Sequence, residues 1–189
     1  MMGAAKRHPR TMLVLGGARS GKSAFAEDTA SAIGLERIYI ATAEAYDAEM
    51  TDRISHHVTR RGAGWRTVEA PRDLDQAIAR EAAPDRVLLV DCLTLWLSNV
   101  LLADEADRDA PERATTRLCD VIASATGPLI LVSNETGLGI VPENALARRF
   151  RDCQGRLNQG VAAAVSKVVF VAGGLPLVLK PEPVQDLSL

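Results

Sequence analysis

GGARSGKS, the stretch from Gly16 to Ser23, decides the fold of this 189-residue chain. It fits the pattern G-x-x-x-x-G-K-[ST] at every fixed position, and the apolar run Thr11–Leu15 precedes it. Glycines let the backbone turn sharply and bring its N–H groups close to phosphate oxygens. A helix is predicted to begin at Lys22, so its positively polarised end would face the same phosphates. The stretch therefore predicts a P-loop that binds a nucleoside triphosphate, and the competing interpretation is an ordinary glycine turn.

Side chains in and near this loop are predicted to contact the nucleotide and its metal ion. Lys22 would pair with the β- and γ-phosphates, and the Ser23 hydroxyl would bind Mg²⁺. Arg19 could also reach a phosphate, although an exposed arginine is the simpler interpretation. The apolar run Val87–Val90 ends in Asp91, which would bring a carboxylate to the Mg²⁺ side of the site. This signal is weak alone, but beside a P-loop it favours Asp91 as a metal ligand.

The rest of the chain alternates short apolar runs with segments of helical periodicity. The predicted strands are Thr11–Leu15, Arg37–Ala41, Trp65–Glu69, Arg86–Val90, Pro128–Ser133, Lys167–Val171 and Leu177–Lys180. The predicted helices are Lys22–Ile33, Asp47–Arg61, Asp73–Glu81, Thr115–Ala125 and Glu143–Ser166. The charged stretch Ala103–Glu112 is predicted to be an exposed loop, and Gly173–Pro176 a turn between the last two strands.

This alternation predicts βαβ units in a mainly parallel sheet. We expect an α/β P-loop NTPase fold of the RecA-like kind, with helices flanking the sheet and an antiparallel hairpin at the C-terminus. One nucleotide-binding domain is expected to span residues 1–189, with residues 1–10 and 182–189 flexible.

Composition excludes several classes of protein. The net charge is −2 and the pI about 5.9, so nothing indicates nucleic-acid binding. The longest apolar run, Val87–Leu102, is interrupted by Asp91 and Asn99 and is shorter than the ~20 residues of a membrane span. The three cysteines lack C-x-x-C spacing, which favours buried thiols in a reducing compartment. With no apolar signal segment, the sequence predicts a cytoplasmic protein.

An adjacent histidine pair, His56 and His57, lies in the predicted helix 47–61. On a helix, His57 would share a face with Arg53, Arg60 and Arg61. A neutral imidazole can attack phosphorus while arginines hold the anionic phosphate. The competing interpretation, a solvated charged face that happens to hold two histidines, is slightly favoured by the residue pattern alone.

Several segments of this chain together resemble one known family. They are LVLGGARSGKS, YIATAEAYDAEMTDRISHH, WRTVEAP, LLVDCLTLWLSN, SNETGLGIVPENALARRFRDCQGRLNQ and the closing hairpin, between Leu13 and about Lys180. They resemble the bifunctional adenosylcobinamide kinase / adenosylcobinamide-phosphate guanylyltransferase family of cobalamin biosynthesis. The resemblance implies two reactions. A triphosphate phosphorylates adenosylcobinamide, and GMP from GTP then passes through a histidine to adenosylcobinamide phosphate, giving adenosylcobinamide-GDP and pyrophosphate.

The resemblance also implies roles for individual residues, and it reverses the balance on the histidines. His57 matches the nucleotidylated histidine, with His56 as the fallback, and Lys22 is expected to act in catalysis. Expected nucleotide-binding positions are Gly16, Gly17, Ala18, Arg19, Ser20, Gly21, Lys22, Ser23, Ala41, Thr42, Ala43, Val58, Thr59, Arg60, Arg61, Glu69 and Asp91. The expected cofactor is Mg²⁺ on Ser23 and Asp91, the substrates are GTP and ATP, and the assembly is a homotrimer. Gly62–Gly64 departs from the family's proline-containing loop, which affects the expected shape of that loop.

Other positions leave alternatives open. Asn134 and Glu135 either contact Mg²⁺, nucleotide or corrinoid, or simply cap a turn. Arg148, Arg149, Arg151 and Arg156 are expected on a solvated helix face or at subunit contacts. Two other functions compete: a simple P-loop kinase without a covalent nucleotide, and a regulatory GTP switch. The chain has no N-K-x-D guanine-reading segment, which argues against the switch.

Overall fold

A computed structural model of the chain describes residues 10–44 and 61–180. The predicted flexible ends, apart from Arg10, and most of the predicted helix 47–61 lie outside these residues. Strands in chain order are β1 (Thr11–Gly16), β2 (Glu36–Ala41), β3 (Trp65–Glu69), β4 (Arg86–Asp91), β5 (Leu129–Asn134), β6 (Lys167–Ala172) and β7 (Leu175–Lys180). Helices are α1 (Lys22–Ala32), α3 (Leu74–Glu81), α4 (Leu93–Ala103), α5 (Ala110–Ser124) and α6 (Ala145–Ala164).

The strands form one seven-stranded sheet in the order β3-β2-β4-β5-β1-β6-β7. All neighbouring pairs are parallel except β6 and β7, which form the expected antiparallel hairpin. The carboxyl ends of β1 to β6 therefore lie at one edge, which we call the carboxyl edge of the sheet, and their starts form the amino edge. Ligands of open α/β sheets bind at the carboxyl edge.

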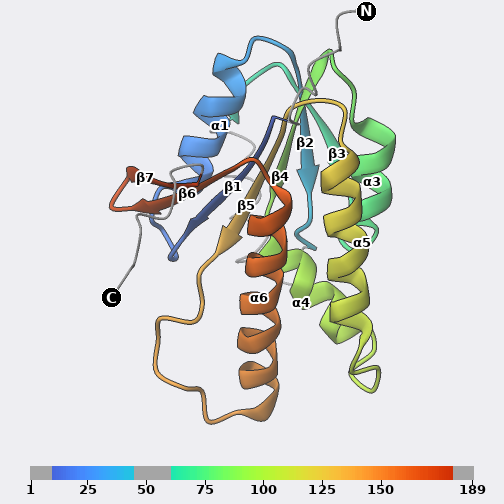
Figure 1. The fold of residues 1–189 in the computed structure, drawn as a ribbon, viewed down its shortest axis with the longest axis vertical. Coiled ribbons are helices and arrows are strands. Elements are labelled where there is room, and N and C mark those ends of the chain that lie inside the picture. The colour runs from blue at the N-terminus through green and yellow to red at the C-terminus, as the bar shows by residue number, and fades with distance from the viewer. Residues whose placement is uncertain (1–9, 45–60, 181–189) are drawn as a thin grey trace, which may run out of the picture.

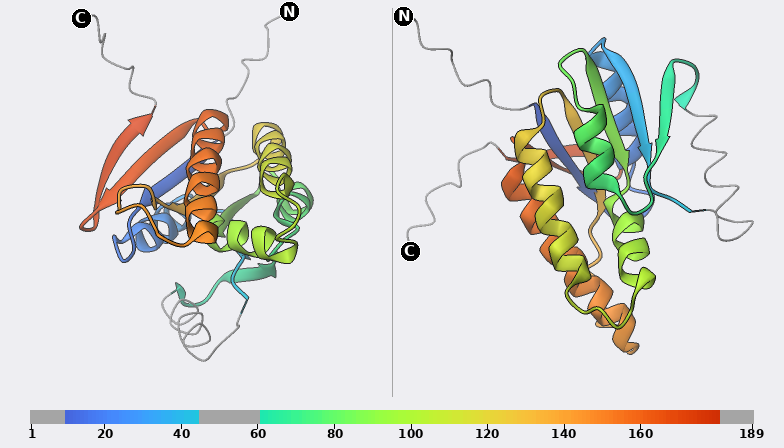
Figure 2. Two further views of the ribbon diagram at one scale, coloured as in Figure 1. Left: turned by 90° about the horizontal axis from the view of Figure 1, so that it is seen from below. Right: turned by 90° about the vertical axis from the view of Figure 1, so that its right-hand side faces the viewer.

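Helices cover both faces of the sheet (Figures 1 and 2). Alternate residues of each strand point to opposite faces. On one face, Val14, Leu89 and Ile130 pack with Ala26 and Ala30 of α1. On the other, a larger core joins the sheet to α3, α4, α5 and α6, with buried side chains such as Leu13, Leu88, Trp96, Leu118 and Leu157. These two apolar layers confirm the α/β prediction.

Helix α4 was not predicted, and the start of α5 was placed too late. Leu93, Trp96, Leu97 and Leu101 of α4 are buried, and further apolar residues such as Leu95, Val100 and Leu102 occupy its other sides. Such a helix shows no amphipathic period that sequence reading could detect. The predicted loop Ala103–Glu112 is partly wrong, since α5 begins at Ala110 with Pro111 in its first turn, where proline is well tolerated.

The C-terminal hairpin turns within two residues. Gly173 and Gly174 both have positive φ, 57° and 81°, a conformation that favours glycine in tight hairpins. The predicted turn over Gly173–Pro176 is therefore too long, because Leu175 and Pro176 already belong to β7. Proline is compatible with an edge strand, where its missing N–H faces no partner strand.

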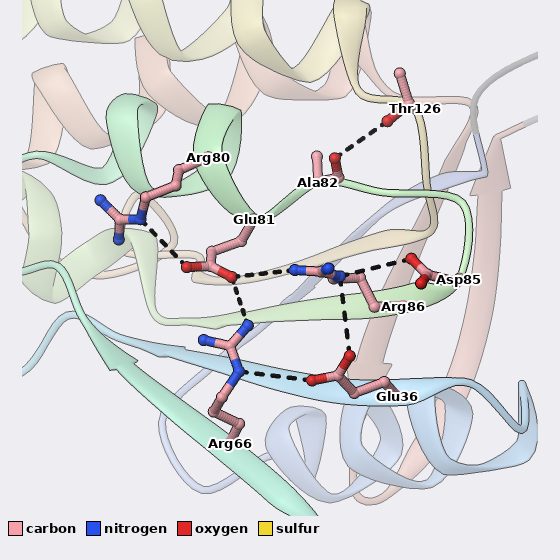
Figure 3. Close-up of polar contacts among 8 residues, drawn as sticks. All are labelled: Glu36, Arg66, Arg80, Glu81, Ala82, Asp85, Arg86 and Thr126. Atoms are coloured by element: carbon pink, nitrogen blue, oxygen red, sulfur yellow. Dashed lines mark hydrogen bonds and ion pairs between the residues drawn. The ribbon is translucent and has the colours of Figure 1, made fainter.

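At the amino edge of the sheet, charged side chains form a network (Figure 3). Glu81 at the end of α3 accepts hydrogen bonds from Arg66 (2.5 Å), Arg80 (3.2 Å) and Arg86 (3.4 Å). Glu36 lies within ion-pair distance of Arg66 and Arg86. Hydrogen bonds from Arg66 above all hold the pKa of Glu81 below its usual range, although its burial acts in the opposite direction.

Candidate nucleotide-binding site

The P-loop leaves β1 at the carboxyl edge with the backbone shape that the sequence predicts. Gly21 has a φ of 97° and Arg19, a non-glycine, a φ of 55°. A Cβ added to Gly16 would lie 2.5 Å from both the Ser20 Oγ and the Val171 carbonyl oxygen. The Ser20 Oγ is buried and makes no hydrogen bond within the described chain. The loop therefore requires glycine at Gly16 for space and at Gly21 for conformation.

Lys22 begins α1 and lies largely buried under the loop. Its Nζ donates a hydrogen bond to the Gly17 carbonyl oxygen at 2.8 Å, so the ammonium lies against the inside of the loop. Burial lowers the pKa of Lys22, and the nearby Cys92 and Asp91 oppose this shift. A lysine ammonium held against the inside of a glycine-rich loop is the arrangement that binds the terminal phosphates of a nucleotide.

Asp91 ends β4 at the same edge, and its neighbours are fixed by buried hydrogen bonds. The fully buried Thr42 hydroxyl donates to the Cys92 carbonyl oxygen and accepts from the Cys92 N–H, both at 2.8 Å. The Asn99 amide donates to the Thr42 and Pro71 carbonyl oxygens. Thr42, an expected binding residue, thus uses its hydroxyl to hold the strand end that carries Asp91.

Cys92 is a buried free thiol. Burial, with a further contribution from Asp91, raises the pKa of Cys92 to about 11, which keeps the thiol protonated at neutral pH. Cys119 is half-buried and Cys153 buried, and all three cysteines are unpaired, as expected.

Arg61, four residues after His57 in the chain, packs on Tyr39 of β2. Its guanidinium carbon lies 3.3 Å from the centroid of the Tyr39 ring on β2, a cation–π contact. Burial and Asp91 raise the pKa of Tyr39 above its usual range, and Arg61 acts in the opposite direction. The Nη1 of Arg61 is buried and makes no hydrogen bond within the described chain.

The remaining expected residues lie along the carboxyl edge at increasing distance from the loop. Ala41 pairs with Asp91 on one side and with Glu69 on the other. Glu69 ends the outermost strand, four strand positions from β1, or about 19 Å at ~4.8 Å per strand. Ala43 and Glu69 therefore line the same edge as the P-loop without touching its phosphate cradle.

Some expected residues fall outside the described part of the chain. These are His56, His57, Val58, Thr59, Arg60 and Arg53. Sequence reasoning also missed residues that shape the site, namely Tyr39 under Arg61, Asn99 and Thr94, whose hydroxyl accepts from the Asn134 N–H. One signal existed for Asn99, because an amide inside an apolar run needs a buried hydrogen-bond partner.

Glu135 and the α6 arginines act mainly within the protein. The Glu135 Oε1 accepts from the Gly137 N–H at 2.7 Å, which is the turn-capping alternative. Arg149 donates to the carbonyl oxygens of Glu105 and Asp107 and so ties α6 to the chain before α5. Arg156 lies on the Cys153 sulfur. The arginines of α6 are therefore not simply a solvated face.

The fold and the loop define a P-loop NTPase with a RecA-like sheet. Similar solved structures include the flagellar accessory protein FlaH from Methanocaldococcus jannaschii (13% identity, TM-score 0.50, 92% of this chain and 79% of that one). Another is an ATPase from the type III secretion system of pathogenic bacteria (10% identity, TM-score 0.52, 89% of this chain and 56% of that one). At these identities the likeness concerns the fold alone.

The family is shown by sequence. A model of the family "Cobinamide kinase / cobinamide phosphate guanyltransferase" matches residues 12–179, and the chain belongs to this family. The bifunctional adenosylcobalamin biosynthesis protein CobP of Pseudomonas aeruginosa is 51% identical, over 90% of this chain and 98% of the relative. The bifunctional adenosylcobalamin biosynthesis protein CobU of Salmonella typhimurium is 43% identical, over 89% of this chain and 99% of the relative.

Of the helices within residues 10–44 and 61–180, none has both the length and the apolar character of a membrane span.

Proposed function

We propose that this protein phosphorylates adenosylcobinamide and then guanylylates the product through His57. The observation that carries the proposal is the P-loop with Lys22 buried beneath it and Asp91 nearby, in a chain that belongs to the cobinamide kinase / cobinamide phosphate guanyltransferase family. The full names of its relatives, bifunctional adenosylcobalamin biosynthesis proteins, support both activities.

In the kinase step, the hydroxyl oxygen of the acceptor attacks the γ-phosphorus of ATP or GTP. The bond from that phosphorus to the β–γ bridging oxygen breaks, the nucleoside diphosphate leaves and the hydroxyl proton is released. Charge develops on the phosphoryl oxygens, where Lys22 and the N–H groups of the loop stabilise it. Ser20, whose buried hydroxyl makes no hydrogen bond within the described chain, adds a polar group inside the loop.

In the guanylyl step, a neutral nitrogen of His57 attacks the α-phosphorus of GTP and pyrophosphate leaves. A phosphate oxygen of adenosylcobinamide phosphate then attacks the same phosphorus, the P–N bond breaks and adenosylcobinamide-GDP forms. Arg61 supports this step, because it lies four residues from His57 and packs on Tyr39 near Asp91. Val58, Thr59, Arg60 and Glu69 complete the proposed nucleotide contacts.

The donor set fits Mg²⁺. No group of three or more His, Cys, Asp and Glu side chains that could hold a metal ion exists in residues 10–44 and 61–180. The proposed ligands are the Ser23 hydroxyl and the Asp91 carboxylate, hard oxygen donors that leave other positions for water and nucleotide phosphates, as Mg²⁺ prefers. When bound, the ion neutralises charge on the phosphates.

We also propose a cytoplasmic homotrimer that binds no nucleic acid. Its biosynthetic, nucleotide-dependent chemistry supports the location, and the acidic pI argues against a nucleic-acid partner. Edge strand β7 exposes Leu175, Leu177 and Leu179, which supports self-association. The trimer itself rests on the family resemblance, and light scattering on the purified protein tests it.

The test incubates the protein with Mg²⁺ and α-³²P-GTP, denatures it and looks for acid-labile, base-stable label. We expect label on the wild type and none on His57→Ala. His56→Ala is the matched control and should retain label. In parallel, γ-³²P-ATP with adenosylcobinamide should give labelled adenosylcobinamide phosphate.

Contrary results separate the alternatives. Absence of covalent label, with acceptor phosphorylation intact, would leave a simple P-loop kinase. Slow GTP hydrolysis with neither label nor acceptor phosphorylation would favour a GTP switch. Label that persists in His57→Ala and disappears in His56→Ala would move the nucleophile to the neighbouring histidine.

A further inference from the structure

The loop between β5 and α6, residues 135–144, exposes large aliphatic side chains to solvent. Leu138, Ile140 and Val141 are 82%, 96% and 60% exposed. Single exposed aliphatic residues are common, but several together in one short loop mark a binding surface. We call this segment the β5–α6 loop. These side chains contribute little to the core and offer an apolar surface to a partner.

One end of the β5–α6 loop is joined to the P-loop. Strands β5 and β1 are neighbours, and Asn134 pairs with Gly16, the first residue of the P-loop. The Glu135 N–H donates to the Gly16 carbonyl oxygen at 3.1 Å. Figure 1 shows the loop leaving the tip of β5 at the carboxyl edge and descending beside α6. The start of the β5–α6 loop is therefore joined to the first residue of the P-loop, and Leu138 follows four residues after Asn134.

The loop is held in place at both ends. At its start, the Asn158 amide of α6 donates to the Asn134 carbonyl oxygen at 3.0 Å. The Asn158 Oδ1 in turn accepts from the buried Ser133 hydroxyl and the Gln154 amide.

At the end of the loop, Asn144 caps α6 by accepting from the Ala147 N–H at 3.0 Å. Arg148 donates to the carbonyl oxygens of Pro142 and Glu143. These bonds fix both ends of the β5–α6 loop, and the aliphatic side chains lie between them.

We propose that the β5–α6 loop binds the corrin macrocycle of the acceptor, with Leu138 and Ile140 packed against its apolar face. This inference rests on the proposed function. The acceptor hydroxyl must approach the γ-phosphorus closely for transfer, yet it lies at the end of a short arm on a large ring. The ring must therefore rest on a surface next to the P-loop. Contact between ring methyl groups and exposed aliphatic side chains removes apolar surface from water, which is favourable.

The occupant is the acceptor rather than the nucleotide for a chemical reason. A nucleotide offers the P-loop its charged phosphates, which bind N–H groups and cations. A methyl-bearing macrocycle offers apolar area, which is what Leu138, Ile140 and Val141 present. The β5–α6 loop would thus bind the apolar acceptor and the P-loop the anionic donor, and both loops begin at the same edge of the sheet.

The test uses the double variant Leu138→Ser/Ile140→Ser of the full chain. We expect KM for adenosylcobinamide to rise about 10- to 100-fold, from the loss of two apolar contacts. The kcat at saturating acceptor, the affinity for ATP and the covalent label from α-³²P-GTP should stay unchanged. Both side chains are exposed, so the melting temperature should also be unchanged. Leu138→Met/Ile140→Met, which keeps apolar area, should retain a KM near that of the wild type.

Leu102→Ser is the matched control. Leu102 is a 51% exposed leucine near the end of α4, outside the P-loop and the β5–α6 loop, and its loss should not change KM for the acceptor. An unchanged KM in the double variant would overturn the inference while leaving the proposed function intact. A wild type that does not phosphorylate adenosylcobinamide would instead overturn the proposed function. A fall in molecular mass by light scattering in the double variant would make the loop a subunit contact and overturn the inference.

Discussion

The amino edge of the sheet is stabilised by charged side chains that pair with one another, whereas the carboxyl edge keeps polar groups that face a ligand site. At the amino edge, Glu81 accepts from three arginines. At the carboxyl edge, the buried hydroxyl of Ser20 makes no hydrogen bond within the described chain, and Lys22 bonds only a loop carbonyl in the described contacts. Buried polar groups cost free energy when they lack partners.

The difference indicates that one edge of the sheet mainly stabilises the fold and the other mainly binds ligands. At the amino edge the charged side chains form ion pairs within the chain and so contribute to stability. The carboxyl edge, with its glycines, a buried cation and a buried Ser20 hydroxyl that makes no hydrogen bond within the described residues, is less stable alone and gains partners when substrate binds. Substitutions at the carboxyl edge should therefore change activity more than stability, and substitutions at the amino edge the reverse.

The largest expected effect is on activity, from Lys22→Ala. Loss of the cation that stabilises the developing phosphoryl charge should lower kcat for acceptor phosphorylation about 10³-fold. Stability should not fall, because burial already disfavours the charged amine and lowers the pKa of Lys22. Steady-state kinetics and thermal unfolding measure both. Lys167→Ala at the exposed start of β6 is the control, and similar kinetic losses in both variants would contradict the division between edges.

Gly16→Ala should disturb the P-loop itself. The added Cβ would lie 2.5 Å from the Val171 carbonyl oxygen and the Ser20 Oγ, so backbone must move, at a cost of about 1–3 kcal/mol in the free energy of unfolding. Nucleotide affinity by calorimetry should fall with it. Gly17→Ala is the stability control, because its added Cβ meets nothing within 4 Å. Equal destabilisation of the two variants would count against the packing argument.

Glu81→Gln should reduce stability by about 2 kcal/mol at neutral pH, because three arginines lose a buried partner, and leave kcat unchanged. The pKa of Glu81 is lowered by Arg66 in the folded state. Its stabilisation is therefore complete above the usual glutamate pKa of 4.5 and is lost as pH falls below it. Urea unfolding between pH 3 and 7 should show the wild type and the variant converging in acid.

The matched control for that prediction is Glu36→Gln. Glu36 belongs to the same network, but its side chain is 52% exposed, and exposed ion pairs contribute at most about 1 kcal/mol. Parallel stability curves for Glu81→Gln and the wild type across the acid range would show that the network does not depend on the Glu81 charge.

The smallest expected effect is at the end of α6, from Lys180→Met. The Lys180 Nζ donates to the carbonyl oxygens of Ala162 (2.9 Å), Ala163 (3.2 Å) and Val165 (2.6 Å). A cation there stabilises the negatively polarised end of the helix, worth about 1 kcal/mol. Urea unfolding should detect this loss, with Lys167→Met as an unaffected control and acceptor phosphorylation unchanged in both.

Much of the fold follows from local sequence pattern. The P-loop was located by its glycine spacing and by the apolar run before it and the predicted helix after it, and only glycine tolerates the close approach at Gly16 and the positive φ at Gly21. The alternation of apolar strands with amphipathic helices indicated the parallel sheet, and the Gly173–Gly174 turn indicated the hairpin. These features depend on residues close together in the chain, so the sequence by itself determined them.

Other features were decided only by tertiary structure, because they join residues far apart in the chain. The insertion of β5 between β1 and β4 sets the separation of the P-loop from Asp91, and no local pattern encodes strand order. Helix α4 carries apolar residues on nearly all sides, including the exposed Leu102, so its sequence shows no clear amphipathic period. Thr42 contacts Cys92 because the ends of neighbouring strands β2 and β4 meet at one edge, and Arg61, which precedes β3, packs on Tyr39 within β2. Local conformational preference fixes an element, but burial and long-range pairing decide which side chains it brings together.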